Sequence, residues 1–184
     1  MKKLLVSLIA GVLLATGLPL SSASAAPYCG ITWGSLAKNN DSAVSHGTSI
    51  FNVRTGQHDC YDRMVFDLNG AAGGYFVQYV PAVYTEGEGA YVPVSGGAIL
   101  QVVVRAPTYD INYKSTYLKN DGKPVMPKEK LPRVNLTGYQ TFKDARYAGS
   151  SEGQSTFGLG VRAKLPFRVV KDGTKIYIDV AHKW

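Results

Sequence analysis

The stretch RMVFDL at residues 63–68 decides the fold class, because its side chains alternate between two faces. Met64, Phe66 and Leu68 would share one apolar face, and the charged side chains would share the other. A period of two is typical of a β-strand that covers a core on one side and meets solvent on the other. The stretch KIYIDV at residues 175–180 repeats this pattern and follows an Asp-Gly turn.

Glycine-rich turns separate further short apolar stretches. Asn69-Gly70 and Gly73-Gly74 predict a turn, after which residues 75–80 return as the next strand. Residues 99–104 are apolar on both faces, which predicts a central strand covered on each side. Weaker strand candidates are residues 135–142, 145–148, 156–161 and 167–170. About eight short strands without a helical stripe predict an all-β fold, an antiparallel β-sandwich with few or no helices.

Two segments interrupt the strands. The sequence EGEG at residues 86–89 is typical of the tip of a long hairpin. Residues 119–133 are rich in lysine and contain Pro124, Pro127 and Pro132. Because proline cannot donate a ladder hydrogen bond, this segment predicts a loop that crosses an end or an edge of the sheets.

The N-terminus has the pattern of an export signal. Lys2-Lys3 precedes an apolar run at residues 4–14, and Ala23-Ser24-Ala25 supplies the small residues of a cleavage site. The run is too short to span a bilayer. We therefore expect residues 1–25 to be a signal peptide and the rest to be a soluble, secreted protein that is either free or associated with the cell wall.

Cys29 and Cys60 are the two cysteines, and they predict one disulfide, since exported proteins meet an oxidising compartment. The closed loop of roughly 30 residues would contribute ~3–4 kcal/mol in the chain-entropy model. Lipid attachment is not expected, because Pro27-Tyr28 precedes the first cysteine in place of small or aliphatic residues. We expect an N-terminal arm over residues 26–55, tied by the disulfide, and a domain over residues 56–184.

The chain is basic, with 20 Lys and Arg against 13 Asp and Glu and a net charge of +7. Loss of Lys2 and Lys3 with the signal peptide would leave +5. A basic exported protein favours an anionic partner such as a wall polymer over nucleic acid. Solubility alone is an equally good interpretation of this charge.

The catalytic motifs considered do not assemble into a site. The three histidines, His46, His58 and His182, lack the spacing of zinc ligands in a hydrolase. The polar cluster from His58 to Asp62 is better interpreted as a turn beside the disulfide. We therefore expect no catalytic residue, no metal site, no cofactor and no enzymatic activity.

Binding residues are predicted in a basic segment that carries tyrosines at every fourth position. Aromatic faces stack on sugar rings, and lysines hold phosphate or carboxylate groups. The candidate residues for a cell-wall glycan or an anionic wall polymer are Tyr109, Tyr113, Tyr117, Lys123, Lys128 and Lys130. The alternative is that the tyrosines line the core with their hydroxyls at its rim.

Two further candidates are arginines that flank the strand motifs. Arg63 and Arg168 would contact an anion through their guanidinium groups. The alternative, which is the commoner arrangement, makes them cross-strand partners of Asp67 and Asp179.

These strand motifs resemble a known family. DRMVFDL at residues 62–68 and KIYIDVAH at residues 175–182 resemble the opening and closing strands of AMIN domains. They are most similar to the AMIN-like domain of secreted proteins and lipoproteins from actinobacteria. The resemblance continues through GYFVQYV at 74–80, TFGLGV at 156–161 and PFRV at 166–169, and covers roughly residues 56–182.

The resemblance implies a β-sandwich that binds the cell envelope, because AMIN domains hold amidases and secretins against peptidoglycan. It implies no activity for the AMIN-like branch. The motifs end at His182, so we expect no catalytic domain after them, and any protein partner stays unidentified. We expect a secreted, non-catalytic envelope-binding module. The alternative is a secreted enzyme or enzyme inhibitor that acts through the Gly-rich and Lys/Pro-rich loops.

The export signal gives a first test. N-terminal sequencing of the secreted protein should begin Ala26-Pro27-Tyr28, because the signal peptidase reads the small residues before that point. Recovery of the protein in the membrane fraction with a lipid on Cys29 would contradict this prediction.

Overall fold

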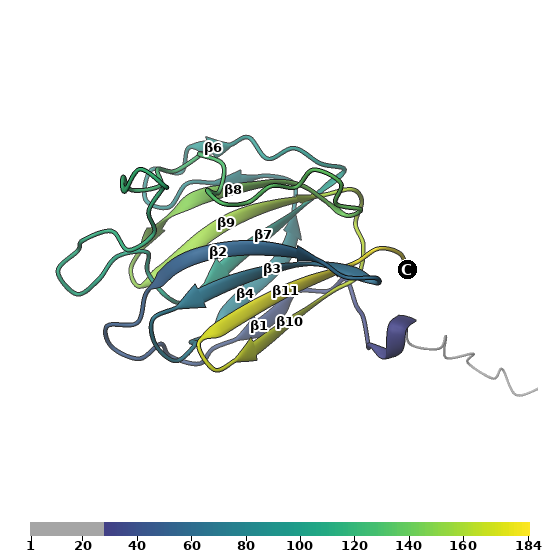
Figure 1. The fold of residues 1–184 in the computed structure, drawn as a ribbon, viewed down its shortest axis with the longest axis horizontal. Coiled ribbons are helices and arrows are strands. Elements are labelled where there is room, and N and C mark those ends of the chain that lie inside the picture. The colour runs from purple at the N-terminus through teal and green to yellow at the C-terminus, as the bar shows by residue number, and fades with distance from the viewer. Residues whose placement is uncertain (1–27) are drawn as a thin grey trace, which may run out of the picture.

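A computed structural model describes residues 28–184 and contains two antiparallel β-sheets stacked as a sandwich (Figure 1). The predicted signal peptide, residues 1–25, lies outside the described residues. The all-β class is confirmed, since the described helical structure is a single 3-10 turn, Tyr28–Gly30. Within the described chain, no helix is long and apolar enough to cross a membrane.

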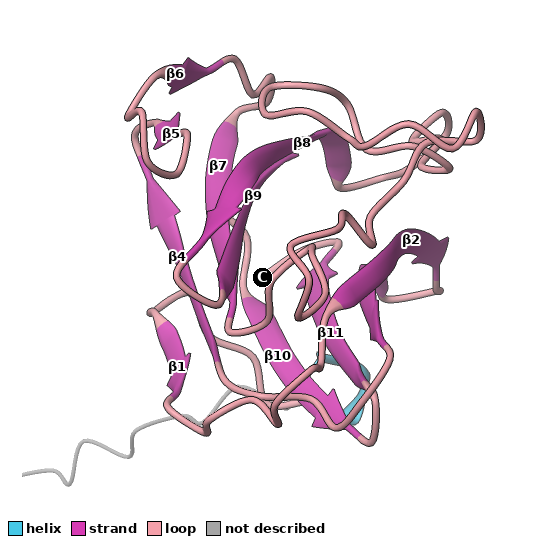
Figure 2. Ribbon diagram, turned by 90° about the vertical axis from the view of Figure 1, so that its left-hand side faces the viewer, coloured by secondary structure: helices cyan, strands magenta, loops and turns pink. Residues whose placement is uncertain are grey.

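The larger sheet has five strands in the order β1-β4-β7-β9-β8, and the smaller has four in the order β10-β11-β3-β2 (Figures 1 and 2). A short hairpin, β5-β6, lies apart from both. In chain order the strands are β1 Lys38–Asn40, β2 Ile50–Gln57, β3 Tyr61–Leu68, β4 Tyr75–Val80, β5 Val83–Tyr84, β6 Tyr91–Val92, β7 Ala98–Val104, β8 Phe142–Ser151, β9 Gln154–Val161, β10 Phe167–Asp172 and β11 Lys175–Ala181.

Strands β3 and β11 confirm the two alternating stretches of the sequence. They are neighbours in the four-stranded sheet, with Phe66 opposite Ile176 and Met64 opposite Ile178. These four side chains are fully buried. The Phe66 ring centroid lies 4.9 Å from that of Phe157 on β9, so the core lies between the two sheets.

Strand β7 is central in its sheet, as its apolar sequence predicts. Leu100, Val102 and Val104 point into the core and are fully buried. On the opposite face, Ile99 packs against a small cluster that includes Val83 of the β5-β6 hairpin. The tip of that hairpin carries the EGEG sequence, also as predicted.

Strand β4 forms at the predicted residues but does not pair with β3. It lies between β1 and β7, so the chain crosses from one sheet to the other. A Cβ on Gly73 would lie 2.7 Å from the carbonyl oxygen of Arg105, and one on Gly74 would lie 2.0 Å from that of Asn40. These glycines therefore allow close packing of the crossing and are not the turn of a hairpin.

The strand expected over residues 135–142 is wrong, because only Phe142 belongs to a strand. Asn135 accepts a hydrogen bond from the backbone N–H of Thr137 at 3.0 Å, and Gly138 has a φ of +81°. A side chain that bonds the local backbone, followed by a left-handed glycine, favours turns over a ladder.

The disulfide between Cys29 and Cys60 is confirmed, with a Cα–Cα distance of 6.4 Å. It ties the start of the described chain to the residue before β3. The segment expected as an arm, residues 26–55, contributes β1 to one sheet and most of β2 to the other.

The proline-rich segment is a loop at a sheet edge, as predicted. The backbone N–H of Lys128 donates to the carbonyl oxygen of Tyr147 at 2.7 Å, and that of Tyr147 donates to Glu129 at 3.0 Å. Leu131 donates to the carbonyl oxygen of Ala145 at 3.2 Å. The loop therefore pairs with β8, the last strand of the five-stranded sheet, and covers an edge that would otherwise be open.

Tyr117 lies in the core, where its ring centroid is 5.9 Å from that of Tyr147 and 6.2 Å from that of Phe157. Burial raises the pKa of its hydroxyl, which has no hydrogen-bond partner among residues 28–184. Tyr117→Phe should therefore change the free energy of unfolding by less than about 1 kcal/mol. Tyr117→Ala should cost about 3–5 kcal/mol, because it leaves a large cavity.

Urea unfolding of both variants checks this prediction. A Phe variant as unstable as the Ala variant would show that the hydroxyl contributes and that packing does not dominate.

Candidate functional site

The predicted binding residues occupy three separate surface regions and the core. Tyr109 and Tyr113 stack on each other, with ring centroids 5.7 Å apart. Lys123, Lys128 and Lys130 lie in the loop that covers β8. Arg63 and Arg168 belong to β3 and β10 of the other sheet.

The spacing of four residues does not place the three tyrosines on one face. Tyr113 is 84% exposed, whereas Tyr117 is 2% exposed and packs in the core. The chain makes a tight loop between them, in which Tyr113 has a φ of +59°. A spacing of four residues aligns side chains only in a regular strand or helix, and this segment is neither.

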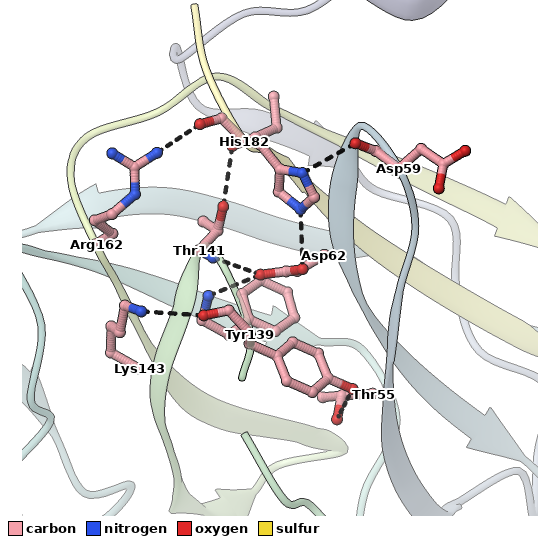
Figure 3. Close-up of polar contacts among 10 residues, drawn as sticks. Thr55, Asp59, Asp62, Tyr139, Thr141, Lys143, Arg162 and His182 are labelled. Carbon is pink, nitrogen blue, oxygen red and sulfur yellow. Dashed lines mark hydrogen bonds and ion pairs between the residues drawn. The ribbon is translucent and has the colours of Figure 1, made fainter. Parts of the chain in front are cut away.

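A basic cavity lies between the β8 strand and the loop that covers it. Its volume is about 330 Å³, and its lining includes Lys130, Asn135, Thr137 and Lys143. Lys143 belongs to β8, and its ammonium group donates to the carbonyl oxygen of Tyr139 at 3.1 Å (Figure 3). It was not among the predicted residues, because only the fold brings it beside Lys130. We call this cavity the lysine groove.

The acidic side chains near the lysine groove are already paired. Asp144 lines the groove, but its carboxylate is nearly buried and lies 3.0 Å from the Nε of Arg146. Glu129 accepts from the backbone N–H of Met126 at 2.8 Å and from Lys119 at 3.0 Å, and both contacts lower its pKa.

The basic side chains at the groove are not paired in this way. Among residues 28–184, the two lysines that line the groove, Lys130 and Lys143, have no acidic side chain within ion-pair distance. The same is true of Lys128 and Arg133, which lie in the same loop outside the lining. The third predicted lysine, Lys123, is outside the groove lining and lies 3.6 Å from Asp121. The groove is therefore positively charged, since its acids are neutralised and its lysines are not.

Arg63 and Arg168 share one buried carboxylate. Asp179 is fully buried and lies 2.6 Å from the Nε of Arg63 and 2.8 Å from that of Arg168. The hydrogen bond to Asp179 raises the pKa of Arg63. Both guanidinium groups also lie over the Tyr61 ring, at 5.2 and 5.4 Å. These contacts place the two arginines as cross-strand partners of Asp179, which was the alternative interpretation.

Asp67 has partners that the sequence did not indicate. The Nε of Arg54 and the side-chain amide of Asn52 each donate to its carboxylate at 2.9 Å. The guanidinium group of Arg162 donates to the carbonyl oxygen of His182 (Figure 3).

A buried polar cluster lies around Asp62 (Figure 3). One carboxylate oxygen accepts from the backbone N–H groups of Thr141 at 2.6 Å and Phe142 at 3.0 Å. The other lies 3.0 Å from the Nε2 of His182, whose Nδ1 lies 3.2 Å from the carbonyl oxygen of Asp59. Both ring nitrogens of His182 therefore lie within hydrogen-bond distance of oxygens of the protein itself.

The described part of the chain offers neither a metal site nor a serine nucleophile in an elbow. No group of three or more His, Cys, Asp or Glu side chains in it is placed to hold a metal ion. An esterase elbow of the Gly-x-Ser-x-Gly type was not expected, yet residues 149–153, GSSEG, match that pattern with Ser151 as its serine. They form the turn of the β8-β9 hairpin, where Ser151 is paired with Gln154. A nucleophile elbow instead joins a strand to a helix.

The Asp62 cluster makes a prediction about stability. Asp62→Ala would leave two backbone N–H groups and the His182 ring without their acceptor, so it should cost about 3–5 kcal/mol of unfolding free energy. Asp121→Ala is the matched control, because its exposed pair with Lys123 should be worth less than about 1 kcal/mol.

Equilibrium urea denaturation measures both values. Equal stabilities of the two variants would contradict a structural role for the cluster.

Comparisons with known proteins agree with this architecture. The AMIN-like domain family profile matches residues 48–182, which run from just before β2 to the residue after β11. Searches of curated proteins and of solved structures found no significant match. The disulfide and the AMIN-like domain are consistent with an extracytoplasmic location. Because the profile covers well over half of the sequence, this chain belongs to the AMIN-like domain family.

Proposed function

We propose that this protein is a secreted, non-catalytic module that binds the cell envelope, and that the lysine groove contacts an anionic wall polymer. The family supports the envelope as the target, because AMIN domains suggest peptidoglycan targeting. The observation that carries the polymer class is the unpaired charge at the groove, where Lys130 and Lys143 line one cavity.

The chemistry of the groove matches a chain of phosphate or carboxylate groups. Lysine ammonium groups act as compact charges with three donors each, so they hold successive anions without demanding one fixed geometry. Asn135 and Thr137 add neutral hydrogen-bonding groups to the lining. The backbone pairing of the loop with β8 keeps its lysines near Lys143 before any ligand binds.

Several features support a function without catalysis. The His182 ring has both nitrogens engaged, so it is unsuited to act as a general base. The Ser150 and Ser151 hydroxyls belong to a hairpin and have no elbow geometry.

A second candidate function is inhibition of a secreted enzyme. The observation that favours it is the β5-β6 hairpin, which displays Tyr84 and Tyr91 at 54% and 56% exposure with ring centroids 6.3 Å apart. Exposed tyrosines are enriched at protein interfaces because they bury much area at low entropic cost.

Sedimentation with purified peptidoglycan, with and without attached anionic polymer, tests the proposal. The wild-type protein should sediment with the polymer-bearing preparation and lose binding as salt rises, since the Debye length falls from ~10 Å at 0.1 M to ~3 Å at 1 M. Replacing Lys128, Lys130 and Lys143 together by Gln should weaken binding by about 3- to 150-fold, from three contacts of about 0.2–1 kcal/mol each.

The matched control replaces Lys164, Lys171 and Lys175 by Gln, which removes the same charge away from the groove. Equal losses in the two triple variants would show that net charge alone drives binding and that the groove is not the site. If the wild-type protein stays in the supernatant with both preparations, envelope binding is wrong and the inhibitor becomes the better hypothesis.

A further inference from the structure

A second pocket lies beside the β8-β9 turn, and the lysine groove does not share its residues. Its volume is about 380 Å³, within the range of about 300–1,000 Å³ typical of ligand sites. Three segments far apart in the sequence form its walls, and its lining includes His46, Tyr109, Asp110, Ile111, Tyr113 and Glu152. We call it the tyrosine pocket.

Tyr113 presents an aromatic face to this pocket. Its side chain is 84% exposed, and its ring is stacked on that of Tyr109 with an interplanar angle of 24°. Tyr109 is anchored in turn, because its hydroxyl accepts from the backbone N–H of Gly153 at 3.4 Å. The pair is therefore a flat platform fixed to the end of β8, and Tyr113 supplies its open face.

Asp110 holds the platform in place. Its Oδ1 accepts from the backbone N–H groups of Asn112 and Lys114, both at 2.9 Å, and its carbonyl oxygen accepts from Tyr113 at 2.9 Å. These bonds keep Tyr113 in the left-handed region, with a φ of +59°. A ring that is oriented before the ligand arrives loses little conformational entropy on binding.

The β8-β9 turn supplies another part of the lining, through Glu152 and Gly153. Both residues have a positive φ, +48° and +78°, as the turn of a two-residue hairpin requires. The hairpin therefore fixes the backbone that carries the Glu152 carboxylate before any ligand binds.

The charge of the tyrosine pocket separates its ligand from that of the lysine groove. Two carboxylates line it, from Asp110 and Glu152, and no lysine or arginine does. An anionic polymer would be repelled there. Carboxylate oxygens instead accept hydrogen bonds from hydroxyl groups, and the Oδ2 of Asp110 is not used by any hydrogen bond within the described residues.

We propose that the tyrosine pocket binds one uncharged sugar ring of a glycan. The C–H face of the ring would stack on Tyr113, and its hydroxyl edge would donate to Asp110 and Glu152. A quaternary ammonium ion is the less suitable ligand, because a single flat platform does not enclose a cation as an aromatic cage does. This proposal goes beyond the lysine groove and does not depend on it.

NMR titration of the ¹⁵N-labelled mature protein with an uncharged N-acetylglucosamine tetrasaccharide tests the proposal. The amide signals of Asn112, Tyr113, Lys114 and Gly153 should shift together. Tyr113→Ala should weaken binding about tenfold or more, as loss of one aromatic stacking contact does in nucleic-acid sites. Tyr113→Phe should bind like the wild-type protein, since it keeps the ring.

Two controls make the result specific. Tyr84→Ala removes an exposed tyrosine whose ring lies against that of Tyr91 on the β5-β6 hairpin, and it should leave tetrasaccharide binding unchanged. The triple Gln variant of Lys128, Lys130 and Lys143 should also bind the tetrasaccharide like the wild-type protein. A negative result for polymer binding at the lysine groove can therefore be told apart from a negative result for sugar binding at the tyrosine pocket.

The proposal would be wrong if the tetrasaccharide shifted no amide signals, or shifted only the signals of other residues. It would also be wrong if Tyr113→Ala bound the tetrasaccharide with unchanged affinity. A fourth contrary result would be that tetramethylammonium, and not the sugar, shifts these amide signals. Because Tyr113 is exposed, its variants should melt at the wild-type temperature, and a thermal scan checks that a loss of binding is not a loss of fold.

Discussion

The buried carboxylate of Asp62 joins the two sheets and the C-terminal end of the domain at one point. Asp62 belongs to β3, and its carboxylate accepts hydrogen bonds from two backbone N–H groups at the start of β8, in the other sheet. The same carboxylate contacts His182, which follows β11. The carbonyl oxygen of Cys60 accepts the backbone N–H of His182 at 2.9 Å, and the disulfide ties the same residue to Cys29. Four residues, 59–62, therefore fix the relative positions of three strands and both ends of the described chain.

This constraint also positions the surfaces to which we assign binding. The backbone N–H of Phe142, the first residue of β8, donates to Asp62. The next residue is Lys143, which lines the lysine groove. The tyrosine pocket lies at the other end of the same strand, beside the β8-β9 turn. At about 3.3 Å per residue, the ten residues of β8 separate the two sites by roughly 30 Å. One extended polymer with charged and uncharged groups would reach both, and such linked contacts raise avidity without new interactions.

The distribution of charge explains why the groove is basic in a protein of moderate net charge. Asp62, Asp67, Asp144 and Asp179 are buried, and each is held by His, Arg or backbone donors. Charges that are buried and paired in this way contribute little to the field outside the protein. Four of the 13 acidic side chains are held in this way, and three of them are paired with arginines. The lysines of the β8 edge loop that have no such partner within the described chain, Lys128 and Lys130, therefore keep their charge at that surface.

The sequence by itself determined the features that depend on neighbouring residues. Alternation defined β3 and β11, an apolar run defined β7, Glu-Gly repeats marked a hairpin tip, and the two cysteines predicted their disulfide. The same local patterns did not reveal which strands share a sheet, so β4 was assigned to the wrong partner.

Only the tertiary structure decided the sites. Tyr113 and Tyr117 have the same residue type and similar neighbours, yet one is on the surface and the other is in the core, because the tight loop between them reverses the chain. Asp62 and His182 are 120 residues apart and meet only because β3 and β11 are paired. Long-range packing sets such contacts, and a pattern of period two or four carries no information about it.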